Sequence, residues 1–195
     1  MIKALLRYRI NHCFKKGQYE RALELLEPLA RKDDAQAQFL IGLVYSNAWK
    51  ELGDDDSFQA EKWFARAADN GHRMAQLMLA DLYALDSERP EQLKRAAKWY
   101  LRAHNSGCPV AGRKLAALYI KHRDRIGIEI NTAGLLYEAA DQGDYKAAVL
   151  LAWMYKKGLC GFQRDFQRFS YWWRKLKQMS KHYSRLPSQN ELLHY

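Results

Sequence analysis

The nonapeptide AQFLIGLVY at residues 37–45 recurs three times further along the chain, and this recurrence predicts the fold. The later copies are AQLMLADLY at 75–83, AGRKLAALY at 111–119 and AAVLLAWMY at 147–155, which gives spacings of 38, 36 and 36 residues. Every copy has alanine first, isoleucine or leucine fifth, glycine or alanine sixth and tyrosine ninth. Positions 1, 5 and 9 fall on one face of an α-helix, so the nonapeptide predicts a helix with a buried stripe.

A second motif follows the nonapeptide in three of the units, at steps of 36 residues. It reads WFARAADNGH at 63–72, WYLRAHNSGC at 99–108 and LLYEAADQGD at 135–144. Gly71, Gly107 and Gly143 each lie just past an apolar-periodic stretch, where the end of a helix commonly needs a left-handed residue. Each unit is therefore predicted to be a helix A, a turn, a helix B and a capping glycine.

Weaker copies of the pattern lie at both ends, at 17–37 and 165–178, as expected for the terminal repeats of a stacked array. We predict one all-α helical-repeat domain over residues 1–179, followed by a tail or short capping helix at 180–195. The predicted repeats are approximately 1–33, 34–71, 72–107, 108–143 and 144–179. The predicted helices are 3–15, 18–31, 35–48, 57–70, 73–86, 90–105, 109–122, 130–142, 145–157 and 163–179. A loop is predicted from Ser46 to Asp56, and Asp56 and Asp165 are predicted N-caps.

These motifs resemble the Sel-one-like repeat (SLR), a relative of the tetratricopeptide repeat. The match covers about residues 17–178, with Ala80, Ala116 and Ala152 in place of the usual helix-A glycine and Leu135 in place of one helix-B tryptophan. The resemblance implies a right-handed α/α solenoid of about five helix-turn-helix repeats. In the second unit it is carried by Ala37, Gly42, Tyr45, Asp56, Ala60, Trp63, Phe64, Ala67, Ala68 and Gly71.

The same resemblance implies a protein-protein interaction module, an adaptor, scaffold or regulator, that binds its partner on the concave face lined by the A helices. The outward helix-A positions are Phe39, Leu43, Asn47, Leu77, Asp81, Leu85, Arg113, Ala117, Lys121, Val149, Trp153 and Lys157. Such a surface would be apolar in its middle and basic toward its C-terminal end, which suits a protein or peptide with apolar anchors and acidic residues. Trp153 has two interpretations: it anchors a partner in this groove, or it packs under the last helix or the tail.

The net charge of +10 is concentrated at the two ends of the chain. Residues 1–18 hold five basic and no acidic residues, and 156–195 hold nine basic and two acidic ones. A stripe that follows a nucleic-acid backbone would instead run along the repeats. The segment 156–185 mixes its cations with aromatic residues, so nucleic-acid binding stays open as an alternative. A dedicated inhibitor of one enzyme, of the immunity-protein kind, is a second alternative.

The sequence carries no signature of a catalytic, cofactor or metal site. It contains no GxSxG, HExxH, GxxxxGK[ST] or GxGxxG motif, and its six histidines follow no metal-ligand spacing. We therefore predict a protein that is not an enzyme, with no cofactor, no metal and no small-molecule substrate. Cys13, Cys108 and Cys160 form neither a disulfide framework nor a CxxC pair, which favours the cytoplasm. The longest apolar run, 147–155, is far shorter than the ~18 residues of a membrane span.

Overall fold

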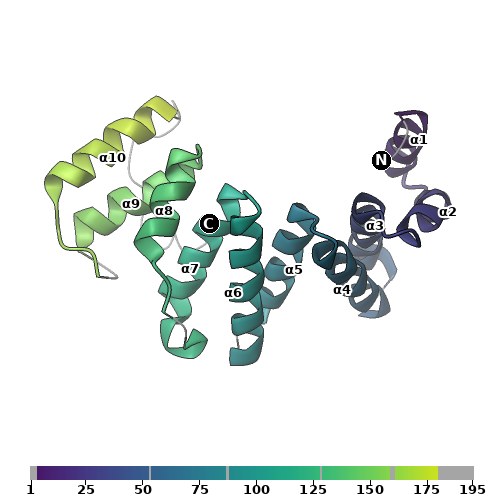
Figure 1. Ribbon diagram of the computed structural model, residues 1–195, viewed down its shortest axis with the longest axis horizontal. Coiled ribbons are helices and arrows are strands. Elements are labelled where there is room, and N and C mark those ends of the chain that lie inside the picture. Colours follow the sequence, from purple (N-terminus) through teal and green to yellow (C-terminus); the bar gives the residue numbers. More distant parts are fainter. Residues whose placement is uncertain (1–3, 53, 87, 128, 159–160, 180–195) are drawn as a thin grey trace. The chain divides into compact units, whose positions relative to one another are not determined.

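The computed structural model describes residues 4–52, 54–86, 88–127, 129–158 and 161–179, and its secondary structure over these residues is entirely α-helical. Each helix overlaps one of the predicted segments, which confirms the all-α class (Figure 1). The helices are α1 (Ala4–Lys15), α2 (Tyr19–Ala30), α3 (Ala35–Leu52), α4 (Asp54–Asp69), α5 (Arg73–Leu85), α6 (Pro90–Asn105), α7 (Pro109–Ile126), α8 (Thr132–Asp141), α9 (Tyr145–Lys157) and α10 (Phe166–Met179).

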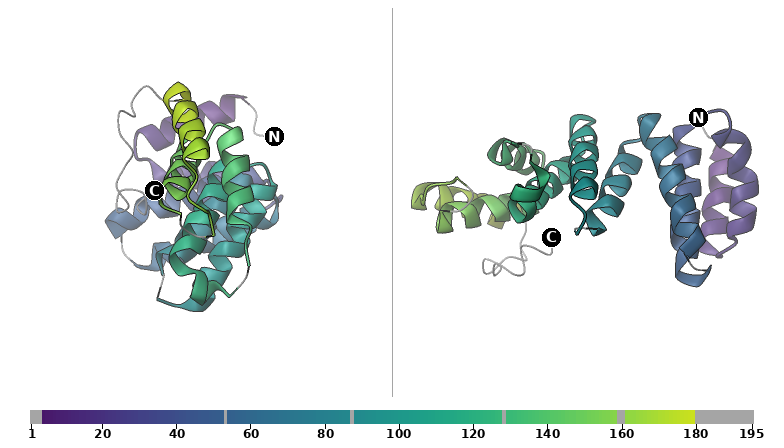
Figure 2. Two further views of the ribbon diagram at one scale, coloured as in Figure 1. Left: turned by 90° about the vertical axis from the view of Figure 1, so that its left-hand side faces the viewer. Right: turned by 90° about the horizontal axis from the view of Figure 1, so that it is seen from below.

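The chain divides into two compact units, which are described separately. Unit 1 ends at Leu82 and contains α1 to α4 with most of α5, whereas unit 2 begins at Tyr83 and contains α6 to α10. In unit 1, α1 packs against α2, α2 against α3 and α3 against α4. In unit 2, each helix from α6 to α9 packs against the helix that follows it (Figure 2). Among the described residues, no helix has the combination of length and apolarity that crossing a membrane requires.

The stripe of residues at positions 1, 5 and 9 of each nonapeptide packs toward the cores of the two units. The first alanine of every copy is fully buried, and the fifth residue is at most 1% exposed in each: Ile41, Leu79, Leu115 and Leu151. The ninth-position tyrosines are less enclosed, because Tyr45 and Tyr83 are half-buried while Tyr119 and Tyr155 retain 9% and 5% exposure. The apolar stripe therefore fills the interior, and its tyrosines lie where the interior meets the surface.

The turns between helix B and the next helix A follow the glycine prediction. Gly71, Gly107 and Gly143 have φ angles of 81°, 82° and 94°, which place them in the left-handed region. The first repeat has Asp33 at the corresponding place, also left-handed at φ 57°. Aspartate tolerates this region better than most residues, because its short polar side chain can form local hydrogen bonds. The first turn therefore keeps the backbone path of the others without a glycine.

The predicted loop from Ser46 to Asp56 is wrong. Helix α3 continues to Leu52 and α4 already begins at Asp54, so Asp56 lies inside a helix and is not its N-cap. The stretch after Ser46 contains alanine, lysine, glutamate and leucine but no breaker before residue 53, so intrinsic propensity favours continuing the helix. The second predicted N-cap is confirmed: Oδ1 of Asp165 accepts hydrogen bonds from the backbone nitrogens of Gln167 and Arg168, both at 2.9 Å.

In α4 and α6, helix B buries the residue that follows the tryptophan of the second motif. Phe64 and Tyr100 are 2% and 4% exposed, whereas Trp63 and Trp99 are only half-buried. Each tryptophan instead lies under a guanidinium from the next turn of its helix, Arg66 at 4.8 Å and Arg102 at 5.0 Å from the ring centroid. The helix-B tryptophans therefore cover the edge of the core.

Candidate functional site

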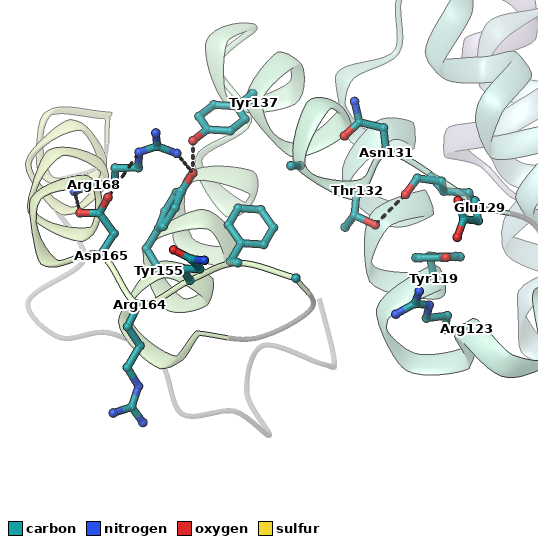
Figure 3. Close-up of a pocket in the computed structure, with 15 residues that line it drawn as sticks. Tyr119, Arg123, Glu129, Asn131, Thr132, Tyr137, Tyr155, Arg164, Asp165 and Arg168 are labelled. Carbon is teal, nitrogen blue, oxygen red and sulfur yellow. Dashed lines mark hydrogen bonds and ion pairs between the residues drawn. The ribbon is translucent and has the colours of Figure 1, made fainter.

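Unit 2 contains an open cleft of about 980 Å³ between the ends of its A helices and the beginnings of its B helices (Figure 3). Its walls come from the C-terminal parts of α7 and α9, the segment 129–131, the beginning of α8, and residues 161–168. We call it the tyrosine–arginine cleft after six of its lining residues: Tyr119, Arg123, Tyr137, Tyr155, Arg164 and Arg168.

The repeat itself places two of these tyrosines. Tyr119 and Tyr155 are the ninth residues of the third and fourth nonapeptides, 36 positions apart, and each lies close to the C-terminal end of its helix A. In each repeat the end of helix A meets the start of helix B. The phenols of Tyr119 and Tyr155 therefore lie along the same edge of unit 2. Tyr137 comes from α8 between them.

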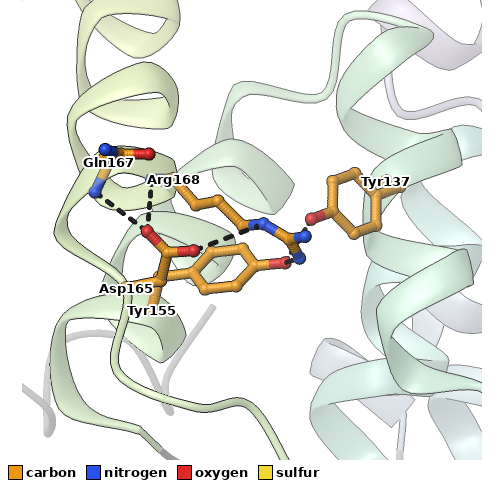
Figure 4. Close-up of polar contacts among 5 residues, drawn as sticks. All are labelled: Tyr137, Tyr155, Asp165, Gln167 and Arg168. Atoms are coloured by element: carbon orange, nitrogen blue, oxygen red, sulfur yellow. Dashed lines mark hydrogen bonds and ion pairs between the residues drawn. The ribbon is translucent and has the colours of Figure 1, made fainter.

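A chain of polar contacts joins four residues of the cleft lining: Tyr137, Tyr155, Asp165 and Arg168 (Figure 4). The hydroxyls of Tyr137 and Tyr155 are hydrogen-bonded to each other, and Nη1 of Arg168 donates to the Tyr155 hydroxyl at 3.0 Å. Arg168 is itself held by Asp165, whose Oδ2 lies 3.4 Å from its Nε. Since Asp165 caps α10, the start of that helix fixes the position of the guanidinium.

Tyr137 stays protonated over the physiological pH range. Burial of the Tyr137 phenol, followed by its hydrogen bond to Tyr155, raises the pKa of Tyr137 above its ordinary value of 10.0. The ring of Tyr155 also lies under Arg168, whose guanidinium carbon is 5.4 Å from the ring centroid. The cleft thus presents the neutral hydroxyl of Tyr137 close to the guanidinium of Arg168.

Two further arginines make the cleft basic. The guanidinium of Arg123 lies over the ring of Tyr119 at 5.9 Å, and Nε of Arg164 donates to the backbone oxygen of Lys157 at 3.2 Å. The carboxylates in the lining belong to Glu129 and Asp165. Asp165 is already paired with the start of α10 and with Arg168, and the lining holds more guanidinium groups than carboxylates.

The structure separates the predicted concave-face residues into three groups. Leu85, Lys121 and Lys157 are exposed, and Phe39, Leu43, Asp81 and Ala117 are half-buried. Leu77, Arg113, Val149 and Trp153 are buried at 4%, 4%, 2% and 8% exposure. The side chain of Asn47 lies outside the described residues, as do Cys160 and the predicted tail at 180–195. The four buried side chains expose too little surface to form much contact with a partner.

Two of the buried residues change the interpretation of the groove. Arg113 pairs with Asp144, with 2.8 Å between Nε and Oδ2, and both side chains are almost fully buried. It therefore contributes to the interior of unit 2 and not to a basic groove. The burial of Trp153 favours the interpretation that it packs inside the array over the one that makes it a partner anchor.

Sequence reasoning missed the cleft, although it had identified some of its parts. The ninth-position tyrosines were assigned only to the buried stripe, and Arg164 and Arg168 only to the basic C-terminal segment. The available signal was the tyrosine itself, because a hydroxyl at a repeat-conserved position needs a polar partner or access to water. Among the described residues, no three histidine, cysteine or acidic side chains are grouped so that they could hold a metal ion.

No protein-family model and no curated protein matches the sequence. Among solved structures, a Sel1 repeat protein from Oxalobacter formigenes is similar at a TM-score of 0.67 and 26% identity, covering 83% of this chain and 65% of that one. A protective antigen present in uropathogenic Escherichia coli strains, which displays an SLR fold, is similar at 0.63 and 23% identity. That match covers 80% of this chain and 33% of the antigen, so both neighbours are longer than the part matched. The repeat pattern and these likenesses together show that the chain has the α-solenoid fold of Sel-one-like repeat proteins.

Proposed function

We propose that this protein is an adaptor, scaffold or regulator that binds a peptide segment of a partner protein and catalyses no reaction. Helical-repeat folds of this type serve generally as protein-interaction modules. The observation that carries the proposal is the tyrosine–arginine cleft. Tyrosine and arginine are among the residues most enriched in interface hot spots, because both combine a large flat contact area with hydrogen-bonding groups.

The chemistry of the cleft supports a ligand with acidic residues. Its arginines are exposed, so they can be desolvated by a partner without first breaking a buried pair. Lys121 and Lys157 are exposed on the same helix ends as Tyr119 and Tyr155, and they would add long-range attraction. These two lysines, with the exposed Leu85, are the concave-face candidates that this proposal retains. We place the protein in the cytoplasm, where the free thiols of Cys13 and Cys108 would remain reduced.

Affinity capture with charge-reversal variants tests the proposal. Full-length protein is used to recover partners from its native cell, with nuclease present, and the parent is compared with Arg123→Glu. We expect the variant to lose most of the captured partner at unchanged melting temperature, since Arg123 is exposed and its loss removes a cleft cation. The matched control is Arg95→Glu, because Arg95 also lies over a ninth-position tyrosine, Tyr83 at 5.7 Å, but outside the cleft. Equal recovery with both variants would contradict the assignment.

Nucleic-acid binding is a second candidate, favoured by the outer surface of α10. Phe166 and Tyr171 are 69% and 53% exposed on this helix. Lysine ammonium groups lie 5.6 Å from the ring centroids of Phe169 and Trp173. Aromatic rings interleaved with cations can stack bases and neutralise phosphates. The test is binding of random-sequence single-stranded RNA: non-specific contacts would fade by physiological salt, whereas sequence-dependent submicromolar binding at that salt would place this function first.

A further inference from the structure

A second, smaller pocket adjoins the tyrosine–arginine cleft. It has a volume of about 280 Å³ and is formed by α6, α7 and α8 together with the segment 129–131. We call it the apolar pocket, after Ala97, Leu101, Leu115, Ile130 and Leu135 in its lining. Leu101 is 46% exposed at its edge, whereas Leu115 and Leu135 at 1% and 8% belong to the interior. The volume is that of a site for one large apolar side chain, below the usual range for a whole small-molecule ligand.

The two sites share a wall. Glu129, Ile130 and Asn131 line both the apolar pocket and the tyrosine–arginine cleft. This wall is fixed by the start of α8: the Asn131 side chain accepts from the backbone nitrogen of Gly134 at 2.9 Å, and the backbone nitrogen of Thr132 donates to the Ile130 oxygen at 2.8 Å. A Cβ at position 134 would lie 2.6 Å from Nδ2 of Asn131, so the glycine leaves room for the capping side chain. The wall is therefore part of a capped helix start and not a loose connection.

We propose that one extended peptide of the partner crosses this wall, with an apolar side chain in the apolar pocket and acidic side chains in the tyrosine–arginine cleft. This inference rests on the proposed function and specifies its ligand. The two sites adjoin at this wall, so the apolar anchor and the first acidic residue should lie within a few positions of each other in the peptide. Glu129 lies at the crossing, where it would repel a carboxylate, so the residue that passes over the wall should be neutral or basic.

The charges of the two sites support this division of roles. The apolar pocket carries Lys98, Glu129 and Glu138 in its lining, and Glu138 faces Nε2 of His104 at 3.0 Å. Its surroundings thus offer no surplus of cations to an acidic ligand. The excess of guanidinium groups lies on the other side of the wall, where Arg123, Arg164 and Arg168 line the cleft. An acidic segment is attracted to one side, and burial of an apolar side chain is the gain on the other.

Selection from a random library tests the inference without knowledge of the natural partner. Phage-displayed random 12-residue peptides are selected on the full-length protein, and enriched peptides are synthesised for affinity measurements. We expect a leucine, methionine or phenylalanine within a few positions of an aspartate or glutamate pair. Leu101→Asp should weaken these peptides about tenfold and remove the apolar preference from a repeated selection, while Arg123→Glu should remove the acidic preference. The control Leu5→Asp changes a leucine that is 74% exposed and lines neither site, so it should leave binding unchanged.

The possible results separate this inference from the proposed function. Peptides that depend on Arg123 but bind Leu101→Asp as tightly as the parent would overturn the two-site ligand and leave the cleft as a peptide site. Peptides that depend on neither residue would overturn both. The melting temperature of each variant is measured alongside. If Leu101→Asp melts at a lower temperature, Leu101→Ala replaces it, with the same weakening required for support.

Discussion

Arg113 on α7 and Asp144 at the start of α9 form an ion pair whose side chains retain 5% and 6% of their surface, with 2.8 Å between Nε and Oδ2. Asp144 also caps α9, because its Oδ1 accepts from the backbone nitrogen of Lys146 at 3.0 Å. One carboxylate thus serves two purposes: it begins a helix and neutralises a buried guanidinium from the preceding helix A. Such a pair couples neighbouring helices through charge as well as packing.

Removal of Arg113 alone should be strongly destabilising. Arg113→Leu would leave Asp144 buried without its cation, which in buried pairs typically costs about 3–5 kcal/mol of the free energy of unfolding. The double variant Arg113→Leu with Asp144→Asn should recover much of this loss, since asparagine keeps the cap and removes the charge. Urea denaturation of the three proteins checks this. A double variant no more stable than Arg113→Leu would show that packing, not charge, dominates at this site.

Gly42 should not accept a methyl group. A Cβ there would lie 2.6 Å from two ring carbons of the buried Phe64, closer than packed carbons come. Gly42→Ala should therefore destabilise the protein by about 1–3 kcal/mol, even though alanine favours a helix by about 1 kcal/mol over glycine. Addition of Phe64→Leu, which shortens the obstructing side chain, should restore part of the stability in a double-mutant cycle. The opposite change Ala80→Gly, at the equivalent position, gives for comparison the combined effect of helix propensity and of the loss of one buried methyl group.

Unit 1 should lose stability in mildly acidic solution through His72. Burial of the imidazole, followed by the charge of Arg73, lowers the pKa of His72 below its ordinary 6.5. The unfolded chain then takes up this proton at a higher pH than the folded one, so stability is unaffected above about pH 7 and falls as the pH drops through 6.5 and on through the folded pKa. Protonation would also remove a contact at the start of α5, because Nδ1 of His72 accepts from the backbone nitrogen of Ala75 at 3.2 Å and cannot do so when protonated.

His72→Asn isolates this effect. Asparagine is a good N-cap at all pH values, so the variant should match the parent near pH 8 and exceed it in stability near pH 5. Melting temperatures over that pH range give the measurement. Parallel pH curves for the two proteins would assign the acid sensitivity to other groups, among them His122, the pKa of which is also lowered by burial.

The helices and turns were predictable because they repeat, and the errors lie where repetition gives no information. Periodicity showed that helix B buries an aromatic residue but not which of two neighbours, since adjacent side chains such as Trp63 and Phe64 point about 100° apart. Arg113 occupies a position that is apolar in the other three nonapeptides, a signal of burial that its charge concealed. Its partner lies 31 residues later, outside any local pattern.

The tyrosine–arginine cleft was not predictable for a related reason. Its walls include the A-to-B connections, which differ among the repeats in length and sequence, so no register places Glu129 or Arg164. Only Tyr119 and Tyr155 were fixed by the repeat. The two tyrosines share an edge because of the way helix A packs against helix B within each repeat. The 36-residue spacing of the sequence does not give this packing.

The titration of Tyr137 reports on the polar chain inside the cleft. Its raised pKa has burial as the first cause and the contact with Tyr155 as the second, so Tyr155→Phe should lower the pKa toward 10.0 without reaching it. Absorbance of tyrosinate against pH, compared with Tyr137→Phe to identify the signal, makes the measurement. The folded protein should also become less stable as the pH rises past 10, because the unfolded chain releases this proton first. If the pKa of Tyr137 stayed as high in Tyr155→Phe as in the parent, the hydrogen bond between the two tyrosines would not contribute to that pKa.

The matching turns at Gly107 and Gly143 have a consequence for how such proteins change over generations. Both turns close with the same backbone hydrogen bond. The backbone nitrogen of Cys108 donates to the Ala103 oxygen at 3.0 Å, and the backbone nitrogen of Asp144 donates to the Ala139 oxygen at 2.9 Å. A gene segment that encodes residues 108–143 begins and ends on the same backbone geometry, so a duplication or deletion of that segment creates no new junction. Other insertions find room in the A-to-B connections, which line the cleft. Duplication of a whole repeat can therefore lengthen the array, whereas insertions and substitutions in the connections between helices A and B change the lining of the cleft.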